Sequence, residues 1–219
     1  MKIYTDSPVY ANWIPDSEIV SDLNEADLVI FTGGEDVDPE LYGERIGKFT
    51  HTNLERDMKE MELFDAAVKM GIPVMGICRG SQFLTVMNNG HLIQHVSNHG
   101  ISTTHAITTK QKEVYQITST HHQMMFPYYL DRGDYEVIAW STEQRSDTYL
   151  DGDDEEMVLP DNGVEIINIE YFFLEPEIVF YPKTKSLCIQ GHPEYSQCPQ
   201  NTRNYLVNLI KTKLFNENI

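Results

Sequence analysis

Short apolar runs alternate with amphipathic stretches along the first ninety residues. Runs rich in β-formers predict strands at residues 2–5 and 26–31. Residues 56–70 carry apolar side chains at helical spacing, which predicts a helix with one apolar face formed by Met58, Met61, Phe64, Ala67 and Val68. Gly71 favours the left-handed end of a helix, and Pro73 prevents the helix from continuing. This order of strands and helices is typical of an α/β fold.

The middle and the end of the chain follow different patterns. Residues 91–180 are richer in strand signals, and we expect strands at 106–109, 114–118, 135–141 and 164–173. The aromatic stretch 171–181 predicts a strand pair under the core, with an apolar subunit contact as the alternative. Residues 202–214 predict an amphipathic helix.

Neither a repeat nor a linker divides the sequence, so we predict a single domain over residues 1–219. The predicted fold is α/β: a flavodoxin-like open sheet, mostly parallel and flanked by helices, with a smaller antiparallel β element in the middle of the chain. The net charge of −18 argues against a nucleic-acid backbone or an anionic membrane as partner. Three cysteines form no paired framework, and no apolar run approaches the length of a membrane span. We therefore expect a cytoplasmic protein.

A cysteine lies at a predicted junction between strand and helix. Residues 72–77 are apolar and β-prone, 76–80 read Gly-Ile-Cys-Arg-Gly, and a helix-compatible stretch follows. A nucleophile elbow has this layout, in which a strand turns sharply into a helix and presents the nucleophile at the bend. The flanking glycines permit a strained backbone, and the helix N-terminus stabilises a thiolate. The pattern predicts Cys78 as a catalytic nucleophile; the alternative is a buried cysteine after an ordinary turn.

A second motif, Gly-His-Pro-Glu at 191–194, follows another apolar stretch more than a hundred residues downstream. Positions i and i+2 of an extended backbone point to the same side. Glu194 can therefore accept a hydrogen bond from one ring nitrogen of His192 while the other nitrogen faces the thiol. Nucleophile, base and orienting group together make a catalytic triad, here predicted as Cys78, His192 and Glu194.

These motifs belong to a wider resemblance. The chain resembles class I glutamine amidotransferases, and most closely the γ-glutamyl hydrolase and γ-glutamyl-GABA hydrolase peptidases. The matching segments follow the order of that family and cover residues from about 28 to 195; they are 31–39, 42–44, Arg56-Asp57-x-x-Glu60, 74–82, 90–94, His121-His122-Gln123 and 191–194.

The attack of a thiolate on an amide carbonyl creates an oxyanion that needs preorganised donors. The backbone N–H of Arg79, directly after the nucleophile, is one such donor, and the resemblance implies a second at Gly34. Residues 33–34 also read as a tight turn, which is compatible with that role. Gln82 lies one helical turn after Cys78 and by resemblance holds the glutamyl part of the substrate, although a helix-surface glutamine is the alternative. The resemblance also implies His122 and Gln123 as substrate-binding residues.

No metal or organic cofactor is predicted. Adjacent histidines on a strand face opposite ways, and no His-x-x-x-His pattern with a carboxylate accompanies His121 and His122. The acidic run 151–156 reads as a solvated loop, with a metal site as the less favoured alternative. Thioester chemistry needs neither kind of group.

The resemblance implies a cysteine hydrolase that cleaves the γ-glutamyl amide bond of a small γ-glutamyl compound through a γ-glutamyl thioester. The alternative is a glutaminase subunit that supplies ammonia to a separate synthetase; a catalytically silent binding protein is disfavoured by the complete triad. The expected ligand is a γ-glutamyl compound or glutamine, and the expected protein partners are a synthetase or further copies of the chain.

Two departures from the family pattern affect these expectations. Only about 25 residues separate the first strand from Thr32-Gly33-Gly34, so the usual first long helix is expected to be shortened or lost. Residues 89–91 read Asn-Gly-His, where Asn89 can adopt a left-handed conformation but His91 is larger and titratable. The pocket shape and pH response near His91 and His95 are therefore left open.

Overall fold

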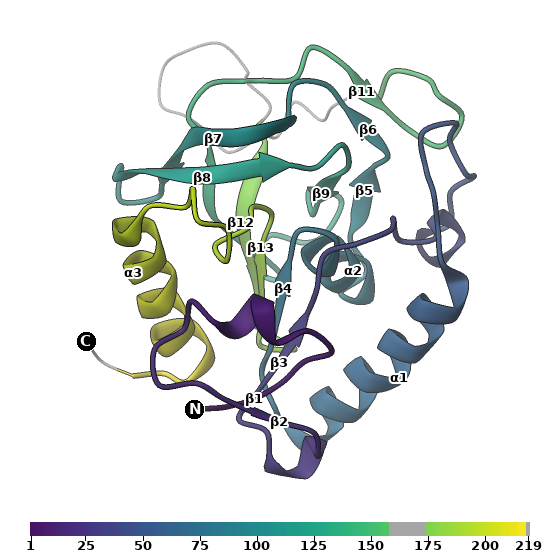
Figure 1. Cartoon of the computed structure of the whole chain (residues 1–219). Helices are drawn as coiled ribbons and strands as arrows, with labels where there is room; N and C mark the ends of the chain where they lie inside the picture. The colour runs from purple at the N-terminus through teal and green to yellow at the C-terminus, as the bar shows by residue number, and fades with distance from the viewer. Residues whose placement is uncertain (158–173, 218–219) are drawn as a thin grey trace.

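One large twisted sheet organises the chain (Figure 1). The computed structural model describes residues 1–157 and 174–217. In order across the sheet, its strands are β2 (Glu18–Val20), β1 (Lys2–Tyr4), β3 (Leu28–Phe31), β4 (Val74–Ile77), β13 (Ser186–Ile189), β12 (Pro176–Tyr181), β10 (Glu136–Ser141), β7 (Gly100–Thr109) and β8 (Val114–Thr120).

The direction of the strands changes halfway across this sheet. The five strands from β2 to β13 pair in parallel and follow the flavodoxin-like order 2-1-3-4-5. From β13 onward, β12, β10, β7 and β8 pair antiparallel. The expectation of a mostly parallel sheet is therefore wrong for the described residues. The antiparallel strands of the middle of the chain extend the main sheet. The sequence did not predict this arrangement, because hydrophobic alternation identifies a strand but neither its partner nor its direction.

Two small antiparallel sheets complete the β structure among the described residues. One joins β5 (His91–Ile93) to β9 (Met124–Phe126), and the other joins β6 (His95–Val96) to β11 (Tyr149–Leu150). Both come from the middle of the chain, where the sequence predicts a smaller antiparallel element.

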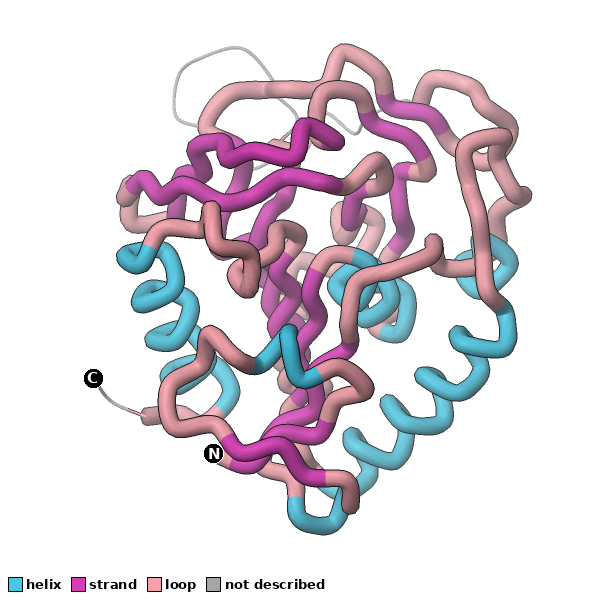
Figure 2. Tube along the Cα trace, viewed as in Figure 1, coloured by secondary structure: helices cyan, strands magenta, loops and turns pink. Residues whose placement is uncertain are grey.

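Helices lie on both sides of the sheet, as Figures 1 and 2 show. On one side are α1 (Leu54–Met70) and α2 (Arg79–Met87), and on the other is α3 (Gln200–Leu209), which continues as a π-helix over Ile210–Leu214. Alternate residues of a strand face opposite sides, so Val29 and Phe31 pack with the α1–α2 side while Ile30 packs with the α3 side. The central strands are buried on both faces and therefore read as continuous apolar runs.

Several expectations about single elements are confirmed. Between β1 and β3 the chain forms only β2 and two short 3-10 helices (Pro8–Ala11 and Leu23–Glu25), so the first long helix is absent there. Gly71 ends α1 with φ 73°, and Asn89 has φ 63°. The strand expected at 164–173 lies outside the described residues, as does the start of the aromatic stretch 171–181.

The expected apolar face of α1 is confirmed for Met61, Phe64, Ala67 and Val68, and it is wrong at the first turns of the helix. Met58 is 57% exposed, whereas Asp57 and Glu60 are buried with Phe64 and Ala67. Two carboxylates occupy the first turns of this face because a buried cation, the Arg79 side chain, lies opposite them. At the first turns of α1, pairing with a side chain of the neighbouring helix therefore overrides the apolar periodicity.

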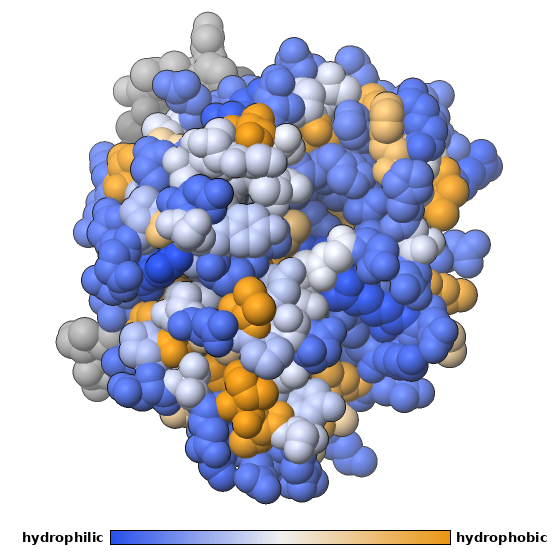
Figure 3. All heavy atoms as spheres, in the orientation of Figure 1, coloured by the Kyte–Doolittle hydropathy of each residue, from blue (hydrophilic) through white to orange (hydrophobic). Residues whose placement is uncertain are grey.

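The surface is mostly polar on the side viewed in Figure 3, where apolar atoms form separate small patches. Within residues 1–157 and 174–217, no helix is both long and apolar enough to cross a membrane.

Candidate active site

Cys78 lies between the end of β4 and the start of α2, with φ 54° and ψ −112°. A non-glycine residue rarely adopts such a backbone, and conformations of this kind concentrate at functional sites. The Cys78 N–H donates to the carbonyl oxygen of Ile189 at 2.9 Å, which ties the bend to the end of β13. The local geometry is that of the predicted elbow.

The glycines of the elbow are required by close backbone approaches. A Cβ on Gly76 would lie 2.4 Å from the carbonyl oxygen of Gly80, and a Cβ on Gly80 would lie 2.1 Å from that of Phe31. Both distances are too short for any side chain, so α2 can start directly against β3 and β4 only with glycine at these positions. The Ser81 hydroxyl adds a hydrogen bond across the junction, with the carbonyl oxygens of Gly76 and Ile189 at 2.8 and 2.6 Å.

His192 and Glu194 follow the end of β13, the strand next to β4. The His192 Nδ1 and Glu194 Oε1 atoms are 2.6 Å apart, and both side chains are almost fully buried. Burial lowers the pKa of His192, but hydrogen bonds with Cys78 and Glu194 raise it to about 10. One ring nitrogen of the imidazole therefore faces the Glu194 carboxylate, as the i, i+2 spacing predicts.

Further contacts hold the His192 ring and backbone in place. The Thr118 hydroxyl accepts from the His192 N–H at 2.7 Å and donates to the His192 carbonyl oxygen at 2.9 Å. The ring of Tyr195 stacks on the imidazole with centroids 4.4 Å apart, and the Tyr10 ring lies 6.3 Å away at a tilt. Thr118, Tyr10 and Tyr195 were not predicted from the sequence, because no local motif connects them with the triad.

The glycine loop after β3 reaches the same place. A Cβ on Gly33 would lie 2.8 Å from the Tyr10 hydroxyl and 3.2 Å from the Cε1 atom of His192. Gly34 has φ 146°, and a Cβ there would collide with the Arg56 guanidinium at 2.0 Å. Gly33 therefore allows the loop to pass close to the imidazole, and Gly34 allows it to pass against the Arg56 guanidinium.

The Arg79 side chain lies away from solvent, in an ion-pair network beneath this loop. Its guanidinium pairs with Asp57 and Glu60 of α1, and its Nε donates to the backbone carbonyl oxygen of Glu35 at 3.1 Å. Arg56 donates to Glu60 at 2.9 Å and to the carbonyl oxygen of Thr32 at 3.0 Å. The Arg56-Asp57-x-x-Glu60 segment thus supports the glycine loop and the start of α2. Its i, i+3 and i, i+4 spacing was the available signal that these side chains share a helix face.

Gln82 is buried, so the alternative of a helix-surface glutamine is wrong. Its Nε2 donates to the backbone carbonyl oxygen of Gln123 at 3.0 Å, and the Gln123 side chain donates to the Thr50 hydroxyl at 3.1 Å. Thr50 in turn donates to Gln94 at 3.0 Å. Two of the predicted binding residues, Gln82 and Gln123, are thus linked through one buried polar chain.

His121 and His122 do point in different directions, although they lie in the bend after β8 and not within a strand. The His122 Nε2 lies 3.1 Å from Asp36 Oδ1 with the imidazole 40% exposed. His121 is buried, and its Nδ1 lies 2.8 Å from the carbonyl oxygen of Gln123. Burial lowers the pKa of His121 to about 3. In the acidic run 151–156, the exposed Asp153 pairs with the exposed Arg45 at 3.1 Å.

A sequence model of the Peptidase C26 family matches residues 8–138, which are more than half of the chain. A glutamine amidotransferase-like protein of Rickettsia prowazekii is 36% identical over 104 residues, covering 44% of this chain and 37% of the relative. A glutamine amidotransferase-like protein of Lactococcus lactis is 33% identical over 123 residues, covering 47% and 52%. The γ-glutamyl-γ-aminobutyrate hydrolase of Escherichia coli O157:H7 is 45% identical over 56 residues, covering 26% and 22%. The chain thus matches about half or less of the length of each of these relatives.

Solved structures share the fold over nearly the whole chain. A protein of Thermoplasma acidophilum, described as belonging to a GMP synthase, superposes with a TM-score of 0.56 at 15% identity, covering 99% of this chain and 95% of that one. A glutamine amidotransferase of Thermotoga maritima gives a TM-score of 0.53 at 14% identity, covering 97% and 85%. At such identities the likeness concerns the fold, which is that of class I glutamine amidotransferases.

Proposed function

The chain belongs to the Peptidase C26 family, within the class I glutamine amidotransferase-like group, and from this premise we propose that it is a cysteine hydrolase of γ-glutamyl amide bonds. Its substrate is a small γ-glutamyl compound, and its products are glutamate and an amine. The proposal includes a covalent γ-glutamyl thioester on the protein.

One observation carries the proposal. Cys78 has the strained backbone of an elbow, its presence raises the pKa of His192, and the Nδ1 atom of His192 lies 2.6 Å from Glu194. A nucleophile, a base in contact with it and a carboxylate that orients the base are the three parts that acyl transfer requires. The pKa of about 10 for His192 favours an imidazolium at neutral pH, which is the form that can give a proton to the leaving amine.

The reaction proceeds in two acyl transfers. The Cys78 thiolate attacks the γ-carbonyl carbon, and the electron pair of the C=O bond moves onto oxygen. The backbone N–H groups of Arg79 and Gly34 stabilise this oxyanion. As the oxyanion collapses, the C–N bond breaks and the His192 imidazolium gives its proton to the departing nitrogen. His192 then takes a proton from water, the hydroxide attacks the thioester, and glutamate and the thiolate are released.

The glutamyl moiety is held by residues of α2 and of the segment after β8. We assign this role to Gln82, His122 and Gln123, since Gln82 and Gln123 are hydrogen-bonded to each other through the Gln123 backbone and His122 is the adjacent, half-exposed residue. Gln123 belongs to the buried chain of hydrogen bonds that begins at Gln82, and His122 directly precedes Gln123 in the sequence.

A second candidate is a glutaminase that passes ammonia to a synthetase, and it is favoured by relatives that are named glutamine amidotransferase-like. Glutamate release by the purified protein alone separates the two candidates. The assay compares glutamine with a panel of γ-glutamyl amines, with Cys78→Ala as the matched control. Rapid turnover of one γ-glutamyl amine over glutamine supports the hydrolase. If the protein turns over none of them, while Cys78 is still alkylated by a glutamine-like electrophile, the stand-alone hydrolase is refuted in favour of the second candidate.

A further inference from the structure

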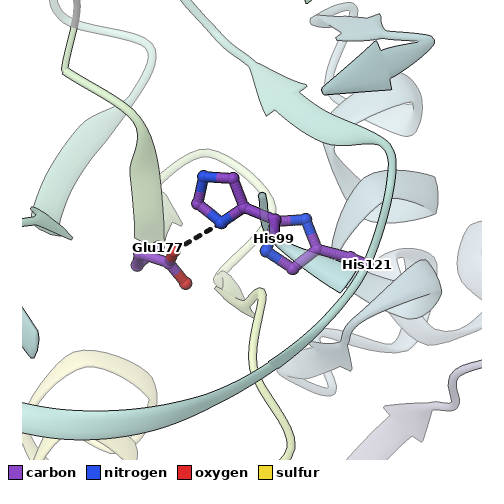
Figure 4. Close-up of side chains that lie close together, drawn as sticks. All are labelled: His99, His121 and Glu177. Carbon is purple, nitrogen blue, oxygen red and sulfur yellow. Dashed lines mark ion pairs between the residues drawn. The ribbon is translucent and has the colours of Figure 1, made fainter. Parts of the chain in front are cut away.

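A second group of titratable side chains lies buried at the antiparallel half of the sheet, and the proposed hydrolysis does not use it. His99 precedes β7, His121 follows β8, and Glu177 lies on β12. One potential ligand atom from each lies within 4.8 Å of the other two, and all three residues are buried. Figure 4 shows His99 between Glu177 and His121. We propose that these three side chains form a binding site for one divalent transition-metal ion, with Zn²⁺ as the best match.

His121 presents a bare nitrogen lone pair to this group. Its Nδ1 lies 2.8 Å from the carbonyl oxygen of Gln123, and a carbonyl oxygen can only accept, so Nδ1 carries the ring proton. The Nε2 atom of the neutral ring is then an acceptor. It is buried and has no hydrogen-bond partner within the described part of the chain. A buried acceptor of this kind calls for a donor or a cation.

His99 is oriented in the same way. Its Nε2 lies 3.1 Å from Glu175, a carboxylate that also accepts from the backbone N–H groups of Arg145 and Ser146. The proton of His99 is therefore on Nε2, and Nδ1 presents its lone pair. A metal-binding histidine commonly donates its other N–H to a carboxylate or a backbone carbonyl in this manner. Glu175 accepts the N–H of His99 just as the Gln123 carbonyl oxygen accepts the N–H of His121.

Glu177 supplies the negative charge. One carboxylate oxygen lies 2.8 Å from His105 Nε2, and the other has no hydrogen-bond partner among residues 1–157 and 174–217. Two neutral imidazole lone pairs and a carboxylate thus converge in a buried space. The Ser119 hydroxyl lies 3.5 Å from His99 Nδ1, but its one proton is directed at the His99 carbonyl oxygen, 2.5 Å away. Acceptors that face one another in a low dielectric are unfavourable, so binding of a cation between these three side chains would stabilise the group.

A proton is the competing cation, and the distances disfavour it. A proton on His99 Nδ1 would face the nearer Glu177 oxygen across 3.7 Å, which is longer than a hydrogen bond. It would also leave His121 Nε2 without a donor. A metal ion satisfies all three atoms together.

The donor set selects the class of metal. Two imidazoles and one carboxylate suit Zn²⁺ and similar borderline cations, whereas Mg²⁺ and Ca²⁺ prefer sets made only of oxygen. Zn–N bonds of about 2.0–2.1 Å place tetrahedral ligands roughly 3.3 Å apart, so small side-chain rotations would contract the group around the ion. Water would fill the fourth position. The bound ion would crosslink three parts of the chain: the segment before β7, the bend after β8, and β12.

The test measures metal retention in a Cys78→Ser background, which removes the partly buried thiol of the elbow as a competing ligand. The EDTA-treated protein is loaded with Zn²⁺, passed through a desalting column and assayed for zinc by mass spectrometry. We expect one ion per chain, loss of that ion in His121→Ala and Glu177→Gln, and retention in the control His91→Ala, a partly exposed histidine outside the group. Glu175→Gln should weaken binding about 10- to 100-fold, because it perturbs the hydrogen bond that orients His99 and leaves the three ligand side chains in place.

A second measurement needs no variant of the buried group. Co²⁺ bound at this site should broaden the ring resonances of His99 and His121 and give visible bands without thiolate charge transfer. Absence of a retained ion in the parent protein would overturn the proposal. Equal retention by correctly folded His121→Ala and Glu177→Gln proteins would overturn it too, as would Co²⁺ broadening confined to surface carboxylates. Because neither readout depends on turnover, the site and the hydrolase activity can fail separately.

Discussion

Replacing Arg79 with methionine removes a buried cation but keeps the backbone N–H that we assign to the oxyanion. The side chains of Arg79 and Asp57 are 2% and 0% exposed, and Glu60 is 11% exposed. Removing one partner of such a pair leaves an uncompensated buried charge, which typically costs about 3–5 kcal/mol. Glu60 retains its bond with Arg56, so the stranded charge is mainly that of Asp57. We therefore expect the free energy of unfolding to fall by about 3 kcal/mol.

Urea denaturation followed by circular dichroism measures this change. A loss of about 3 kcal/mol lowers the unfolding midpoint by roughly 1 M or more in urea. Adding Asp57→Asn to Arg79→Met should recover much of the loss, since the stranded charge is then gone. Lys59→Met, which breaks the exposed pair with Glu55 on the same helix, is the control and should leave the midpoint unchanged. This interpretation is refuted if Arg79→Met is no less stable than Lys59→Met, or if Asp57→Asn makes the double variant worse.

Three other outcomes follow from the site. His192 carries a pKa of about 10 against an ordinary 6.5, so the stabilisation that its bonds provide is complete below about pH 6.5 and is lost as pH rises through 10 in a pH series of urea melts. Glu194→Gln removes one cause of the raised His192 pKa, so the alkaline limb of the pH–rate profile should move to lower pH. The loss of rate should be smaller than the loss caused by Cys78→Ala. An unmoved alkaline limb would contradict the assignment of Glu194. Gly80→Ala should destabilise by about 1–3 kcal/mol or more because its Cβ meets the Phe31 carbonyl, whereas Gly133→Ala, which has open space, should stay within about 0.5 kcal/mol in the same melts.

The elbow and the His-Pro-Glu motif could be predicted because their geometry is local. A strand that turns at Gly-x-Cys-x-Gly and a histidine two residues before a glutamate on extended backbone are set by neighbours in sequence. The same is true of the ends of α1 and α2, where Gly71 and Asn89 adopt the left-handed conformation that the sequence predicts.

What the sequence could not predict depends on partners far along the chain. Asp57 and Glu60 are buried on α1 only because Arg79 lies opposite, so the apolar periodicity pointed to Met58 instead. The antiparallel half of the sheet was misjudged because alternation within a strand does not encode its partner's direction.

The buried histidine group gave even less signal in the sequence. His99 and Glu175 are 76 positions apart, and His105 and Glu177 are 72 apart. No ligand spacing of a familiar kind connects them, and the adjacent His121-His122 pair argued against a metal. Only the pairing of β7, β10 and β12 in one sheet brings these side chains together.

The central claim is a γ-glutamyl thioester on Cys78. The direct test mixes the protein with its best γ-glutamyl substrate, stops the reaction with acid within the first turnovers, and maps the adduct by peptide mass spectrometry. We predict one γ-glutamyl group on the peptide that contains Cys78, released by hydroxylamine, and neither adduct nor turnover in a folded Cys78→Ala protein. Turnover by Cys78→Ala at the rate of the unaltered protein, or an adduct on another residue, would contradict the claim.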